Sequence, residues 1–499
     1  MGRAGDIVAR AALEAEPPFT IGVTGKWGCG KTSVMRRAFA TLGGRSISQN
    51  LRLGADKLEL DREEQTKLCF KDSSRTTALP WDGQIIEAAK QSLSIWYSPW
   101  QHQGAENPLI PLLQELRAQY CEKRKSLETK NKVLNRNSGL AALALLEHII
   151  DAAISLNIGK PVKIFSGVTE NTRKVWNENN PENLVKPSDG QRFHLLFEDA
   201  VENLLQDLHN ATPTKFRTSK FDNTARLIIF IDDLDRCEEK AVVTLLEAIK
   251  LYLGTRRCVF VLGVDEVAVG DALKRHWHGR SDDSNREYLE KLFQAMIPVP
   301  QPEEKSLQAL IIEQLQSHDF PQNSIAKLAQ DITQLLEPNP RKIKNFLNSL
   351  CANWQILRNE AMQNPEHCQR LVMFQYLRHN HRPVWRLLER EPNLLPLLQR
   401  VIVQQSLEPI PGYTGEEHRL AREIFTRSFA HVLPHVAENG DTKTTKHNSQ
   451  DLDQAVERAL ESLDRRRSDQ HFMSWARDFL SPVEPLHPMY LRINSENNT

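Results

Sequence analysis

The chain has no excess of charge and few cysteines. Lysine plus arginine and aspartate plus glutamate each total 64 of its 499 residues, so the formal net charge is zero. A balanced chain has no overall field that would attract nucleic acid or an anionic membrane, and we find no strong nucleic-acid signal. The seven cysteines stand singly with no CxxC pair, so the sequence favours neither a disulfide framework nor a zinc site.

Long hydrophobic runs are also missing. The most apolar stretch, Gly139–Leu146, is followed at once by Glu147, His148 and Asp151. A membrane-spanning helix needs about 20 mostly apolar residues, so we expect no transmembrane segment. The first fifteen residues predict an alanine-rich helix with charged side chains rather than a signal peptide. The expected location is therefore the cytoplasm.

Several catalytic motifs are absent. The sequence contains neither GxSxG nor HExxH, and its histidine pairs (His276/His278 and His379/His381) lack nearby acidic partners for a metal centre. The Arg-polar pairs that precede His367 and His381 do not have the six-residue spacing of an RNase site. A separate nuclease or hydrolase centre in the C-terminal half is therefore disfavoured.

A complete phosphate-binding loop of the form GxxxxGKT is present near the start, at Gly25–Thr32. Phe19–Val23 predicts a buried strand before it, and Lys31–Leu42 predicts a helix that ends at the Gly43-Gly44 pair. A strand, a glycine-rich loop and a helix N-terminus together form an anion site. The predicted nucleotide-binding residues are Gly25, Lys26, Trp27, Gly28, Cys29, Gly30, Lys31, Thr32 and Ser33.

Two carboxylates predict the second half of the site. Leu227–Ile231 is an apolar run typical of a strand buried on both faces of a parallel sheet, and Asp232 and Asp233 follow it. We expect Lys31 to bring positive charge to the β- and γ-phosphates, and Thr32 and Asp232 to hold Mg²⁺. Asp233 is placed to orient or polarise the attacking water.

A third strand is predicted at Cys258–Val264, after a helix at Val242–Tyr252, so this segment is a βαβ unit. Asp265 ends the strand. Its carboxylate has two interpretations that the sequence leaves open: it positions water near the γ-phosphate, or it caps the helix that begins at Glu266.

These motifs together resemble the KAP family of P-loop NTPases. The resemblance rests on Trp27 inside the loop and on the order of further stretches, and it covers roughly residues 1–355. The stretches are Trp96–His102, Ile229–Cys237, Val261–Asp265, Tyr288–Pro298 and Asn339–Asn348. The family is similar to other additional-strand ATPases, which implies a core of about five parallel strands. Many members carry a transmembrane hairpin between the loop and the acidic strand, and this sequence does not.

Two arginines are candidates for contact with the γ-phosphate. By resemblance, Arg341 looks like a sensor in a second domain that touches nucleotide when the domains close. Arg236 follows the acidic strand and either pairs with Asp235 or Asp233 or reaches a neighbouring subunit. A structural salt bridge is the alternative for each.

The expected fold class is α/β, a parallel P-loop NTPase sheet flanked by helices, with a helical insert and an all-α C-terminal domain. We expect residues 1–125 and 223–302 to form the NTPase domain, residues 126–222 the insert, and residues 303–499 the C-terminal domain. The clearest helical pattern is the apolar stripe from Ile343 to Leu357, after an Asn339 cap and Pro340.

Three functions remain open at this point. The first is Mg-dependent ATP hydrolysis that drives a conformational or assembly change; the second is a slow nucleotide switch that recruits a protein partner or a second copy. The third, disfavoured above, is an ATP-licensed effector such as a nuclease. ATP is preferred over GTP because no NKxD or TKxD stretch follows the acidic strand. The resemblance also implies bacterial antiphage systems of the Qat type as a hypothesis.

Overall fold

The computed structural model describes residues 2–44, 89, 91–102, 105, 107–128, 136–157, 189–212, 224–250, 254–276, 282–357, 365–391, 394, 397–398, 415–429, 465–474 and 476. The chain divides into two compact units, residues 1–300 and residues 301–499. Of the predicted C-terminal domain beyond Phe429, only helical residues 465–474 and Ala476 lie among the described residues.

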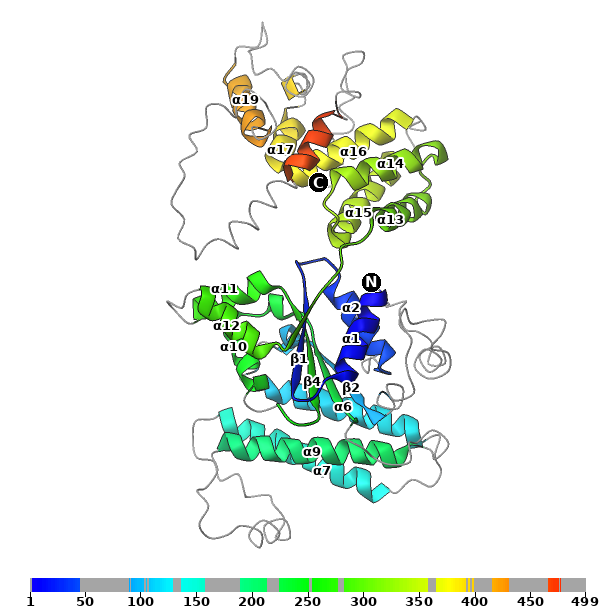
Figure 1. Cartoon of the computed structure of the whole chain (residues 1–499). Coiled ribbons are helices and arrows are strands. Elements are labelled where there is room, and N and C mark those ends of the chain that lie inside the picture. Colours follow the sequence, from blue (N-terminus) through cyan, green and yellow to red (C-terminus); the bar gives the residue numbers. More distant parts are fainter. Residues whose placement is uncertain are drawn as a thin grey trace. The chain divides into compact units, whose positions relative to one another are not determined.

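The first unit is built on a five-stranded parallel sheet with the strand order β2-β3-β4-β1-β5. The strands are β1 (Phe19–Thr24), β2 (Leu93–Tyr97), β3 (Leu227–Ile231), β4 (Cys258–Val264) and β5 (Ala295–Pro298). This confirms the predicted parallel α/β sheet, and it places β1 between β4 and β5 rather than at an edge (Figure 1).

Both faces of the sheet are covered by helices. All five residues of β3 are buried, and they alternate between two cores, so Ile229 and Ile231 face one layer while Ile228 and Phe230 face the other. Helices α1 (Gly2–Glu14) and α2 (Lys31–Thr41) cover the second layer. The first layer is covered by α6 (Leu109–Glu128), α10 (Glu239–Ala248), α11 (Glu266–His276) and α12 (Asp282–Leu292), and its core extends to α7 (Arg136–Asn157) and α9 (Asp189–Ala211), which pack against α6.

The local signals that bound α2 act as the sequence predicts. The helix begins at Lys31 directly after Gly30, whose φ of 113° is a conformation that favours glycine. It ends where Gly43 takes a positive φ and the Gly44 N–H donates to the Phe39 carbonyl at 2.8 Å. Helix α10 begins at Glu239, three residues before the predicted start at Val242.

Helices α7 and α9 fall in the range predicted as an insert, and their apolar side chains share one core with the sheet. Phe193 and Phe197 of α9 belong to the same buried cluster as Leu93 and Ile95 of β2. Asp207 of α9 is buried and accepts hydrogen bonds from the Tyr120 hydroxyl at 2.6 Å and from the Arg124 guanidinium at 2.8 Å, both on α6. The insert helices are therefore packed on the sheet unit.

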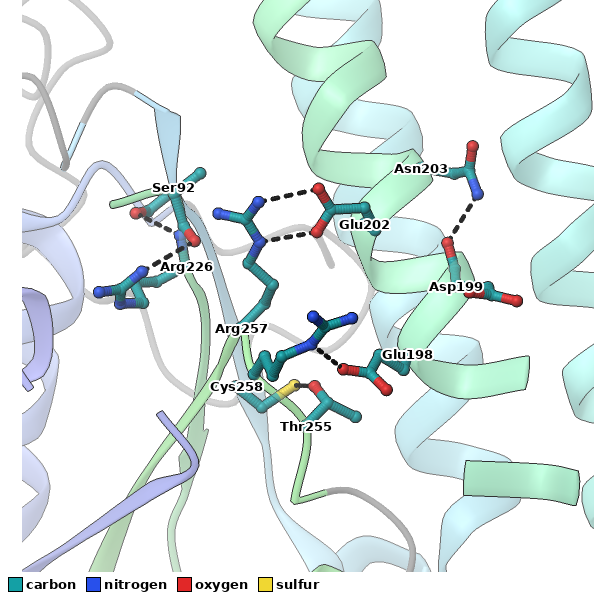
Figure 2. Close-up of polar contacts among 11 residues, drawn as sticks. Ser92, Glu198, Asp199, Glu202, Asn203, Arg226, Thr255, Arg257 and Cys258 are labelled. Carbon is teal, nitrogen blue, oxygen red and sulfur yellow. Dashed lines mark hydrogen bonds and ion pairs between the residues drawn. The ribbon is translucent and has the colours of Figure 1, made fainter. Parts of the chain in front are cut away.

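Ion pairs join α9 to the amino ends of the strands (Figure 2). Arg257, directly before β4, forms a two-pronged pair with Glu202, with nitrogen–oxygen distances of 2.7 and 2.8 Å. Arg256 pairs with Glu198 at 2.5 Å, but its side chain is 86% exposed. These contacts lie at the edge of the sheet opposite the phosphate loop, which follows the carboxyl end of β1.

The described part of the second unit is helical. Its labelled helices are α13 (Glu304–Gln316), α14 (Gln322–Leu335), α15 (Pro340–Leu357), α16 (Pro365–Asn380), α17 (Arg382–Arg390) and α19 (Glu416–Phe429). The Asn339 side chain accepts hydrogen bonds from the Arg341 and Lys342 N–H groups, so it caps α15 as predicted. Five members of the predicted apolar stripe are buried: Ile343, Phe346, Leu347, Leu350 and Trp354.

Candidate functional site

The loop Gly25–Gly30 joins β1 to α2 at the carboxyl edge of the sheet. The Gly25 N–H donates to the Val264 carbonyl at 3.2 Å, which ties the loop to the end of β4. Gly25 has a φ of 156°, a conformation that residues with a side chain rarely adopt, and a Cβ atom there would lie 2.6 Å from the Cys29 sulfur, so the loop favours glycine at this position. The N-terminus of α2 follows this loop directly, which is an arrangement suited to a phosphate group.

Lys31 lies inside this loop and is almost fully buried. Its ammonium Nζ donates to the Gly25 carbonyl at 2.8 Å and lies 3.6 Å from Asp235 Oδ2. The two side chains are 8% and 10% exposed. Lys26, Trp27 and Ser33, which belong to the predicted nucleotide-binding set, are exposed instead.

The side chains of Thr32, in α2, and Asp232, directly after β3, contact each other at the carboxyl ends of the strands. The Asp232 N–H donates to the Tyr97 carbonyl at 3.1 Å, and its side chain is nearly buried and accepts a hydrogen bond from Thr32. Burial raises the pKa of the Asp232 carboxyl, the charge of Asp233 raises it further, and the Thr32 hydrogen bond lowers it. One hydroxyl and one carboxylate are hard oxygen donors, and they suit Mg²⁺ where phosphate and water complete its coordination.

Asp233 takes a left-handed backbone conformation, with φ 60° and ψ 30°, and begins the short helical turn η2 (Leu234–Arg236). Its Oδ1 lies 3.0 Å from Arg236 Nε, and its Oδ2 accepts a hydrogen bond from the Ser98 hydroxyl at 3.5 Å. Of the three partners that the sequence left open for Arg236, the structure gives Asp233. The guanidinium also lies 5.5 Å from the centre of the Trp100 ring, in the turn η1 (Pro99–His102).

Asp265 follows β4 and contacts the start of α11. Its Oδ1 accepts a hydrogen bond from the Ala268 N–H at 3.4 Å, and its carbonyl accepts one from Val269 at 2.9 Å. These are the contacts of a helix cap, the second of its two interpretations. Its charge also raises the pKa of the Cys29 thiol in the phosphate loop, so the carboxylate lies near that loop as well.

Arg341 belongs to the second unit. It is the second residue of α15, and its N–H donates to the Asn339 side chain at 3.1 Å. The structure therefore gives this residue a place at a helix N-terminus and leaves its predicted role as a nucleotide sensor a proposal.

Two residues of the site were missed by the sequence reasoning. Asp235 was considered only as a partner for Arg236, but its carboxylate faces Lys31. Ser98 was considered only as part of the stretch Trp96–His102, but its hydroxyl donates a hydrogen bond to Asp233. The sequence does contain a signal for Asp235, because a third carboxylate follows two others in the run Asp232-Asp233-Leu234-Asp235.

Comparison with known protein families decides the classification. The model of the KAP family P-loop domain matches residues 6–355, which is more than half of the chain. The chain belongs to the KAP family. It therefore carries a P-loop NTPase domain, whose fold is a nucleotide-binding one, and the phosphate loop and acidic strand described above fall inside the matched region. None of the curated proteins matches this KAP chain. Among the described residues, no helix has the length and apolar character needed to cross a membrane.

Proposed function

We propose that this KAP protein binds Mg-ATP at Gly25–Ser33 and hydrolyses it to drive a conformational or assembly change. One observation carries the proposal: Lys31, Thr32 and Asp232 meet at the carboxyl edge of a parallel sheet, beside the N-terminus of α2. The hydrogen bond between Thr32 and Asp232 joins the two halves of the site, which come from distant parts of the sequence.

Each residue then has a defined task in binding. The loop amides and the α2 N-terminus hold the phosphates, and Lys31 moves its ammonium from the Gly25 carbonyl to the β- and γ-phosphates. Thr32 and Asp232 would hold Mg²⁺, which supplies positive charge to the β- and γ-phosphate oxygens.

The proposed chemistry depends on Asp233. Its carboxylate orients the attacking water and accepts its proton, while Arg236 and Arg341 are candidates to stabilise negative charge on the γ-phosphate. Asp265 is the reserve candidate for the water. Asp233 has one partner on each oxygen, Arg236 and Ser98, and each oxygen keeps a further lone pair that can accept a hydrogen bond from the water.

That pairing favours a second candidate function, a slow nucleotide switch that recruits a protein partner or a second copy of the chain. The Arg236 ion pair holds the Asp233 carboxylate in its present orientation, so basal hydrolysis would be slow until a partner rearranged η2. Under either function the nucleotide is ATP, since the sequence lacks a guanine-reading NKxD stretch after the acidic strand.

Release of phosphate by the purified full chain tests the proposal. We expect turnover with ATP and Mg²⁺ that is lost in excess EDTA and in Asp232→Asn. Binding of ATP without turnover would favour the switch. A wild-type chain that neither binds nor hydrolyses ATP would contradict both functions.

The biological setting is a further part of the proposal. Resemblance to hairpin-less KAP proteins suggests a cytoplasmic role in bacterial antiphage defence, acting with protein partners. Plaque formation on strains with and without the locus tests this. Equal plaquing across a broad phage panel would contradict it.

A further inference from the structure

We infer that Asp235 is an internal competitor for the phosphate-loop lysine: its carboxylate pairs with Lys31 and sets how tightly nucleotide binds. The inference rests on the proposed nucleotide site and adds a residue to it. The decisive contact is the 3.6 Å distance between Lys31 Nζ and Asp235 Oδ2.

Burial makes this contact more than a surface ion pair. The two side chains are 8% and 10% exposed, and the remaining contacts of the ammonium are neutral carbonyls, Gly25 at 2.8 Å and Lys26 at 3.4 Å. A buried ammonium is costly unless a negative charge lies nearby. Asp235 provides that charge, and the phosphates of a bound nucleotide would compete with it for the ammonium.

The turn that carries Asp235 explains how the carboxylate reaches the lysine. Asp232 and Asp233 follow β3 directly, and the left-handed backbone of Asp233 redirects the chain into η2. This turn separates the three carboxylates: Asp232 accepts from Thr32, Asp233 pairs with Arg236, and Asp235 faces Lys31. Each acidic side chain of the turn therefore has its own partner in the site.

The consequence for binding has a definite sign. When a nucleotide binds, Lys31 turns to the phosphates, and Asp235 loses its cation and is left beside added negative charge. Both effects oppose binding. Removing the carboxylate therefore tightens nucleotide binding, whereas a purely structural loss would weaken it.

Calorimetric titration of ADP into the full chain in excess EDTA tests this, because without a metal the carboxylate cannot act through Mg²⁺. We expect Asp235→Asn to bind ADP about fivefold more tightly than wild type, the range of one ion pair. Asp235→Ser, whose side chain is smaller and also uncharged, should tighten ADP binding as well. It serves as the test if Asp235→Asn folds poorly. The matched control is Glu238→Gln, which removes the same charge from an exposed side chain three residues further along the chain and should change ADP affinity less than about twofold.

The outcomes separate the inference from the proposed function. Tighter binding in both Asp235 variants but not in Glu238→Gln supports the inference. Equal or weaker binding in the Asp235 variants, with wild-type binding intact, overturns the inference and leaves the nucleotide site standing. A wild-type chain that binds neither ADP nor ATP overturns both.

Discussion

At the scale of single residues, the site separates binding from chemistry. Lys31, Thr32 and Asp232 are buried or half-buried, whereas Asp233 is 24% exposed and paired with Arg236. The first three residues are suited to hold phosphate and metal, and Asp233 is suited to bind a water molecule. This division predicts that the two functions fail separately on substitution.

Asp233→Asn should leave Mg-ATP bound but slow hydrolysis by a factor on the order of 10²–10⁴, the usual loss for a water-activating base. The amide retains acceptor and donor atoms for Ser98 and removes the charge. Single-turnover phosphate release, with ATP affinity measured on the same sample, tests this. Asp265→Asn is the control, and its turnover should stay near wild type if its carboxylate serves as a cap. Unchanged turnover in Asp233→Asn would move the catalytic role to Asp265.

The alkylation rate of Cys29 is a chemical probe of the phosphate loop. Burial raises the pKa of its thiol, while Lys31 acts in the opposite direction. Because alkylation requires the thiolate, the rate at Cys29 should be slow at neutral pH and keep rising with pH beyond the ordinary thiol pKa. Bound ATP should protect the thiol. Mass spectrometry after timed alkylation, with Cys29→Ser as control, measures this; a rate that is already maximal at pH 7 would contradict it.

At the scale of elements, different structures are attached to the two ends of the parallel strands. The carboxyl edge carries the phosphate loop, while α9 attaches to the amino edge through the ion pairs of Figure 2. These pairs are not equal. The Arg257 side chain is 9% exposed and bound at two points, whereas the Arg256 side chain is 86% exposed.

Glu202→Gln should therefore destabilise the sheet unit by about 1 kcal/mol, since it removes the negative charge that binds the buried Arg257 guanidinium at two points. Glu198→Gln is the matched control on the same helix, and it should leave stability unchanged because its partner is held in solvent. Urea unfolding of both variants measures the difference. Equal stability of the two variants would show that the buried pair does not anchor α9.

Much of the sheet was predictable because its signals are local. The apolar runs at β3 and β4, the glycine loop and the helix ends at Gly30 and Gly43 each lie within a few consecutive residues. The resemblance of the ordered motifs to the KAP family was confirmed by the family match over residues 6–355.

The polar pairing within the site was not predictable in the same way. Lys31 meets Asp235 because Asp233 takes a left-handed conformation, which is uncommon for a residue other than glycine and has no clear sequence signal. The Ser98 contact joins residues 135 positions apart and depends on β2 pairing with β3. Which carboxylate contacts which cation was therefore fixed only by the fold.

At the scale of the whole molecule, substitution of Arg341 tests whether the helical unit responds to nucleotide. If it reaches the γ-phosphate, ATP but not ADP should protect the proline-rich linker Pro298–Glu304 from proteolysis. Limited proteolysis with ADP and with a non-hydrolysable ATP analogue measures this on wild type and Arg341→Ala. The variant should bind the analogue yet lose the protection. Identical cleavage in all four samples would return Arg341 to a structural role at the start of α15.

The central claim is that the buried lysine of the phosphate loop binds the nucleotide. Calorimetric titration of Mg-ATP into wild type, Lys31→Ala and Lys26→Ala tests it most directly, because both variants remove one positive charge from the same loop. The Lys31 ammonium is buried and contacts Asp235 and two loop carbonyls, whereas the Lys26 side chain is exposed. The account predicts that Lys31→Ala abolishes measurable ATP binding while Lys26→Ala retains it within a few-fold. Wild-type ATP affinity in Lys31→Ala would contradict the account.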